Sequence, residues 1–109
     1  MSIDLPPPID LYVTAENAGD IEAFSQCFAP DATVLDEGHS YRGQAAIKQW
    51  MAAAKAKYHH RIEPLAVADR AGETVLTAKL TGNFPGNPVT VDFRFVIESG
   101  KIVSLEIGG

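Results

Sequence analysis

The sequence predicts an α+β fold, because its helical patterns come early and its strand patterns come late. Residues 44–58 repeat apolar side chains at helical spacing, and four β-rich runs follow between residues 61 and 107, separated by turn signals. This order is typical of helices packed on one face of an antiparallel sheet. No internal repeat or linker interrupts the 109 residues, so we interpret residues 1–109 as a single domain.

Two short helices are expected at the N-terminus. Pro6–Pro8 suits a first helical turn, whose N–H groups need no partner, and Gly19 suits a left-handed end. The buried face of this first helix is expected to hold Ile9, Tyr12, Val13 and Glu16. Asp20 is a good cap for a second helix, and Pro30 would end it. The apolar face of this second helix is expected to hold Ile21, Phe24 and Phe28.

A short strand, a loop and a long helix are expected next. Residues 31–36 form a β-rich strand that ends on Asp36, and residues 37–43 form a loop. Residues 44 to about 58 have the clearest helical pattern of the chain. Its apolar positions are Ile47, Trp50, Met51, Ala54 and Tyr58.

The second half is expected to form a meander of four strands. The predicted strands are Arg61–Asp69, Glu73–Thr81, Val89–Glu98 and Lys101–Ile107. Turn residues separate them at Ala71–Gly72, Gly82–Pro88 and Ser99–Gly100.

The composition excludes several classes of protein. Nine basic and fourteen acidic residues give a net charge of −5, which argues against nucleic acid or an anionic membrane as partner. No apolar run is long enough to span a membrane, and the N-terminus shows no secretory signal. The lone Cys27 cannot form an intramolecular disulfide. We therefore expect a cytoplasmic protein.

Five stretches of the sequence carry a resemblance to known proteins: Tyr12, Gly19–Ala23, Phe28–Asp36, Gly43–Ile47 and Ser99–Val103. Together they resemble the NTF2-like superfamily, and within it the SnoaL-like proteins and the bacterial ketosteroid isomerases. The resemblance covers nearly the whole chain and is weakest between about Tyr58 and Val89. It implies an NTF2-like cone, in which three N-terminal helices pack on a curved antiparallel sheet and enclose a pocket.

The resemblance to the ketosteroid isomerases implies a catalytic trio. The base falls on Asp36, the tyrosine that stabilises the oxyanion falls on Tyr12, and the neutral acid falls on Asp92. In such a site two hydrogen-bond donors stabilise an enolate while a carboxylate moves the proton. Each residue also has a structural interpretation: Tyr12 as core packing, and Asp36 as a turn former.

Asp92 leaves two orientations open. It alternates with Phe93 along its strand, so it faces away from that residue, and its face is either the pocket lining or the exterior. Arg94 shares this face, and an ion pair between the two would keep Asp92 ionised. An Asp–Arg pair is also similar, more weakly, to the limonene-epoxide hydrolases of the superfamily.

Further residues are candidates for the pocket lining. Phe28 and Met51 stand where isomerases often have supporting tyrosines. The other candidates are His39, Trp50 and Arg94. Of the adjacent His59 and His60, at most one is expected to enter the pocket. We expect no metal and no cofactor, because no second spaced ligand accompanies these histidines.

Three functions remain open at this point. The first is an isomerase-like or cyclase-like enzyme that moves a proton on a small apolar ketone. The second is a module that binds an apolar ligand without reaction, and the third is an assembly partner. We also expect a homodimer through the sheet. The face of Phe93 and Phe95 alternates with that of Asp92 and Arg94, and one face would meet the helices or pocket while the other needs a partner.

Overall fold

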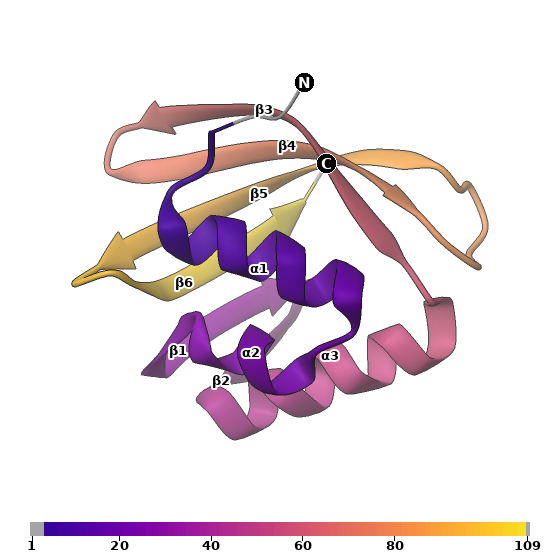
Figure 1. Ribbon diagram of the computed structural model, residues 1–109, viewed down its shortest axis with the longest axis horizontal. Coiled ribbons are helices and arrows are strands. Elements are labelled where there is room, and N and C mark those ends of the chain that lie inside the picture. Colours follow the sequence, from indigo (N-terminus) through magenta and orange to yellow (C-terminus); the bar gives the residue numbers. More distant parts are fainter. Residues whose placement is uncertain (1–3, 109) are drawn as a thin grey trace.

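The structure is a computed structural model that describes residues 4–108. Figure 1 shows the helices gathered on one face of a twisted sheet, with the first helix lying across it. No helix within the described residues is long and apolar enough to cross a membrane. The elements are α1 (Pro7–Ala18), α2 (Ile21–Gln26), β1 (Phe28–Asp36), β2 (His39–Arg42), α3 (Gln44–Tyr58), β3 (Arg61–Arg70), β4 (Glu73–Thr81), β5 (Val89–Glu98) and β6 (Lys101–Gly108).

The helix boundaries follow from local signals in the sequence. Prolines fill the first turn of α1, and Gly19 ends it with a φ of 71°. The Asp20 side chain accepts a hydrogen bond from the backbone N–H of Ala23 at 3.1 Å and so caps α2. The predicted long helix is confirmed as α3, which has the predicted bounds.

The six strands form one sheet in the order β2-β1-β6-β5-β4-β3. The predicted meander is confirmed, since β3 to β6 pair antiparallel in sequence. The expectation of a fully antiparallel sheet is wrong at one pairing, because β1 runs parallel to β6. The chain enters β1 from α2 at the end of the sheet where β6 begins, and there Ile102 N–H donates to the Cys27 carbonyl at 2.9 Å. Both strands therefore start at the same end.

The segment predicted as a loop forms a hairpin. Strand β2 pairs antiparallel with β1 through a two-residue turn at Glu37 and Gly38, whose φ values are 54° and 78°. Two positive φ values suit the right-handed twist of the flanking strands. The hairpin stands between α2 and α3, so α3 follows two strands instead of standing at the N-terminus with the other two helices.

Phe28 begins a strand, so its predicted place on the second helix is wrong. Helix α2 ends at Gln26, and Phe28 pairs with Ile102 in β6. Pro30 contributes to the early end, because it has no N–H to donate to the carbonyl of Gln26 four residues before it.

The core lies between the helices and the inner face of the sheet. Along β5, Phe93 and Phe95 are fully buried while Asp92 and Arg94, which alternate with them, are only partly buried. The period of two thus assigns one side of β5 to the core and the other to the outer face. The largest fully buried side chains are Ile9, Tyr12, Phe24, Phe28, Val34, Ile47, Met51, Leu76, Phe93, Phe95, Ile102 and Leu105.

Candidate functional site

A pocket of about 960 Å³ opens between the helices and the inner face of the sheet. It is bounded by α1, by α3 and by the ends of β1 and β6, and the turn between β4 and β5 contributes to one side. Its lining is mainly apolar and aromatic, as in typical small-molecule sites. The larger side chains of this lining are Tyr12, Tyr41, Trp50, Met51, Tyr58, Leu80, Phe84, Val91, Phe93 and Ile107.

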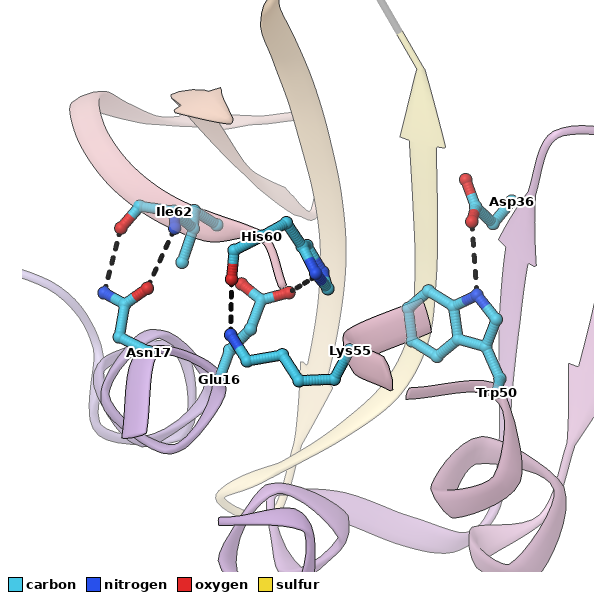
Figure 2. Close-up of polar contacts among 7 residues, drawn as sticks. All are labelled: Glu16, Asn17, Asp36, Trp50, Lys55, His60 and Ile62. Carbon is cyan, nitrogen blue, oxygen red and sulfur yellow. Dashed lines mark hydrogen bonds and ion pairs between the residues drawn. The ribbon is translucent and has the colours of Figure 1, made fainter. Parts of the chain in front are cut away.

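Asp36 reaches this pocket from the end of β1. Its carboxylate is half-buried, and its Oδ2 accepts a hydrogen bond of 3.2 Å from the indole Nε1–H of Trp50 on α3 (Figure 2). Burial raises the pKa of the Asp36 carboxyl above its ordinary value. The Trp50 hydrogen bond opposes this rise, Glu37 adds to it, and the charges of His60 and His39 lower the pKa slightly. A positioned carboxylate with a raised pKa has the properties of a general base.

Tyr12 lines the same pocket from α1. Its ring is fully buried among aromatic side chains, with centroid distances of 4.8 Å to Phe24 and 5.3 Å to Phe95. Its hydroxyl has no hydrogen-bond partner among residues 4–108. Burial, and then the nearby charges of Glu16 and Asp36, raise the pKa of Tyr12 well above its ordinary value. The hydroxyl therefore keeps its proton and can donate it to a ligand oxygen.

A buried carboxylate–imidazole pair, which is an ion pair when His60 is protonated, lies in the pocket wall one helical turn beyond Tyr12. Glu16 Oε1 and His60 Nε2 are 3.0 Å apart, and the two side chains are only 2% and 11% exposed (Figure 2). Within the part of the chain that the structure describes, the other polar atoms of the pair, Glu16 Oε2 and His60 Nδ1, have no hydrogen-bond partner. Both residues line the pocket.

The junction after α3 holds His60 in place. His59 ends the helix in the left-handed conformation, with φ 50° and ψ 40°, and Lys55 Nζ donates to the His60 carbonyl. The end of β4 packs closely on this junction at Gly82. A Cβ there would lie 2.8 Å from the carbonyl oxygen of Tyr58 and 2.9 Å from the Cα of His60, so only glycine fits.

The structure brings together four of the predicted site residues. Tyr12, Asp36, Trp50 and Met51 all line the pocket. Phe28 is fully buried in the core against the Tyr12 ring, with a centroid distance of 6.2 Å, and does not line the pocket.

Asp92 and Arg94 do not join this group, because they lie on the outer face of β5. Asp92 accepts a hydrogen bond of 2.8 Å from the Thr77 hydroxyl on β4 and lines a separate small depression beside Arg70. Among residues 4–108 no ion pair joins Asp92 to Arg94. Of the two orientations that the sequence left open, the structure has the exterior one.

The candidate His39 also lies outside the pocket, while Glu16 and His60 lie inside it. His39 is exposed on β2 and does not line the pocket. Glu16 and His60 do line it: sequence reasoning expected at most one of His59 and His60 in the pocket, and placed Glu16 only on the buried face of the first helix. The available signal was a carboxylate on the apolar face of α1, four residues after Tyr12.

The comparisons with known proteins agree with this fold. A polyketide cyclase candidate from Sinorhizobium meliloti has a crystal structure that superposes with a TM-score of 0.93, at 41% identity over 98% of both chains. A protein with a ketosteroid isomerase-like fold from Catenulispora acidiphila, solved in complex with trimethylamine, has a TM-score of 0.85 at 18% identity, over 97% of this chain and 87% of that one. An NTF2-like protein from Cytophaga hutchinsonii has a TM-score of 0.77 at 15% identity, over 98% and 92% of the two chains.

At these low identities, the last two structures support the fold alone. No curated protein sequence matches the chain. The family model of the SnoaL-like domain matches residues 9–105, which is most of the chain. The chain therefore belongs to the SnoaL-like domain family, with the NTF2-like fold.

Proposed function

We propose that this chain is an enzyme that moves a proton next to a carbonyl group of a small, largely apolar compound. The observation that carries the proposal is a half-buried carboxylate, Asp36, held by an indole N–H inside a mainly apolar pocket. The relative from S. meliloti is a candidate polyketide cyclase. Closing a carbon ring in a polyketide begins with removal of a proton beside a carbonyl, so this chemistry needs the same kind of base as a ketosteroid isomerase.

In this proposal Asp36 is the base and Tyr12 is the donor to the carbonyl oxygen. The Trp50 hydrogen bond fixes one carboxylate oxygen and leaves the other for the substrate proton. Removing that proton places negative charge on the carbonyl oxygen, and a neutral hydroxyl in a dry site stabilises this charge. The unpartnered hydroxyl of Tyr12 is the group in the pocket that fits this role.

Isomerisation of a simple β,γ-unsaturated ketone, cyclohex-3-en-1-one, tests the proposal. Formation of the conjugated isomer is followed by its ultraviolet absorbance. Asp36→Asn keeps the shape of the side chain but removes the base, so we expect the rate to fall by about 10²–10⁴. Asp31→Asn is the matched control, since Asp31 lies on the same strand and is exposed.

The alternative is a non-catalytic module that binds a ligand without turnover. Binding of the ketone with no isomerisation in the wild-type protein would favour that alternative, and full activity in Asp36→Asn would exclude Asp36 as the base. The homodimer through the sheet and the cytoplasmic location stay predictions.

A further inference from the structure

Three buried polar atoms gather in the wall of the pocket without a hydrogen-bond partner. They are Tyr12 Oη, Glu16 Oε2 and His60 Nδ1, and they are the buried side-chain nitrogen and oxygen atoms that lack a partner among residues 4–108. All three residues line the pocket. Buried polar atoms are nearly always paired in folded proteins, so three unpaired atoms on residues that line one pocket need an explanation.

The proposed reaction accounts for Tyr12 but not for the other two atoms. Glu16 and His60 satisfy one atom each through their ion pair, and the second atom of each stays unsatisfied. Folding alone does not require this pair, because well-packed apolar residues replace a buried ion pair at little or no cost in stability. The polar pair thus fits a role in binding better than a role in packing.

The chemistry of the pair selects the group that it would bind. Glu16 Oε2 accepts hydrogen bonds, and a ligand carboxylate would be repelled by Glu16 and by the other two acidic residues of the lining, Asp36 and Glu37. A neutral hydroxyl has a proton to donate to Glu16 and carries no charge to be repelled. Its oxygen can in turn pair with the nearby imidazole when Nδ1 carries a proton.

We propose that Glu16 and His60 form a polar subsite that binds a neutral hydroxyl of the ligand, separate from the carbonyl group activated by Asp36. The ligand would then be a hydroxylated carbonyl compound with an apolar body. The inference rests on the proposed function in that both place the ligand in this pocket.

A pair of bicyclic ketones tests the subsite. The probes are 1-tetralone and 6-hydroxy-1-tetralone, which carries a hydroxyl at the end of the ring system opposite the carbonyl. Their dissociation constants are measured by quenching of Trp50, the only tryptophan and a pocket residue, at about pH 6, where a phenol is neutral. Since a hydrogen bond to a charged group is a strong one, we expect the hydroxylated ketone to bind at least about tenfold more tightly to the wild-type protein.

Variants test whether the preference for the hydroxylated ketone comes from the Glu16–His60 pair. In Glu16→Leu/His60→Leu the ratio of the two dissociation constants should fall to about one. Ile62→Val is the matched control: it trims a buried side chain two residues after His60, outside the pocket, and should keep the tenfold ratio. A ratio near one in the wild-type protein, or a tenfold ratio that survives in the double variant, would overturn the inference.

The binding test of the subsite can fail or succeed independently of the isomerisation test of the proposed function. A preference that is lost in Glu16→Leu/His60→Leu, with no isomerisation in any protein, supports the subsite and refutes the enzyme. Isomerisation that depends on Asp36, with no preference between the ketones, refutes the subsite alone. If neither ketone binds at millimolar concentration, the subsite as stated is wrong, and the cyclohexenone assay still decides on the enzyme.

Discussion

Replacing His60 by leucine should destabilise the protein strongly, because it leaves the Glu16 carboxylate buried without its partner. The Glu16 side chain is 2% exposed, and its ion pair with His60 at 3.0 Å is the polar contact that the structure gives it. Lys55 is the nearby cation, but its ammonium group is bonded to the His60 carbonyl. Breaking a buried pair in this way costs about 3–5 kcal/mol, a large part of the roughly 5–15 kcal/mol that stabilises a typical domain.

The double variant Glu16→Leu/His60→Leu separates charge from packing. It removes both polar side chains, so no carboxylate is left buried alone. We expect its free energy of unfolding to equal or exceed that of the wild-type protein, since apolar replacements of buried pairs are neutral or stabilise by about 1–4 kcal/mol. The single variant should therefore be the least stable of the three proteins.

Urea unfolding at pH 7, followed by circular dichroism and extrapolated linearly to water, measures these differences. A loss below about 1 kcal/mol in His60→Leu would mean that the carboxylate is solvated or neutral, and would refute the reasoning. Equal losses in the single and double variants would show that His60 acts through its packing.

Further predictions concern other residues of the pocket and the core. Folding raises the pKa of the Asp36 carboxyl, so its contribution to stability is full below its unfolded pKa of about 4 and is lost as the pH rises through its folded pKa. In urea unfolding, Asp36→Asn should therefore be more stable than the wild-type protein at pH 7, and this difference should vanish near pH 3. Tyr12→Phe removes a buried hydroxyl that has no partner, so it should unfold at higher urea, with a gain of about 1 kcal/mol, while isomerisation slows; a loss of stability would show that the hydroxyl has a partner. Cys27 is buried and its pKa is raised to about 11, so iodoacetamide at about pH 8 should label the native protein at least about 100-fold more slowly than the urea-unfolded chain; comparable rates would contradict its burial.

Local signals in the sequence predicted the long helix and the meander, and the reasons are physical. The spacing of Ile47, Trp50 and Met51 fits only a helix, and the glycine-containing turns set the ends of the last four strands. The hairpin at Glu37–Gly38 was missed because its first residue adopts a positive φ without being Gly, Asn or Asp. The parallel pairing of β1 with β6 depends on where α2 ends in space, which no local pattern records.

The sequence predicted several residues of the site, but not which face of a strand lies toward the pocket. Strand periodicity showed that Asp92 and Phe93 point to opposite sides, yet only the packed helices decide which side is inside. Tyr12 and Asp36 were found through a family resemblance. The Glu16–His60 pair joins residues 44 positions apart, and sequence spacing carries no information on such a contact.

The most direct test of the account is whether Asp36 takes a proton from carbon. Exchange of the protons beside the carbonyl of 1-tetralone for deuterium is followed by proton NMR in D₂O, with wild-type protein, Asp36→Asn and Asp31→Asn compared under the same conditions. The account predicts that the wild-type protein and Asp31→Asn accelerate the exchange. In Asp36→Asn the exchange rate should be lower by a factor of about 10²–10⁴. Exchange at the wild-type rate in Asp36→Asn would contradict it.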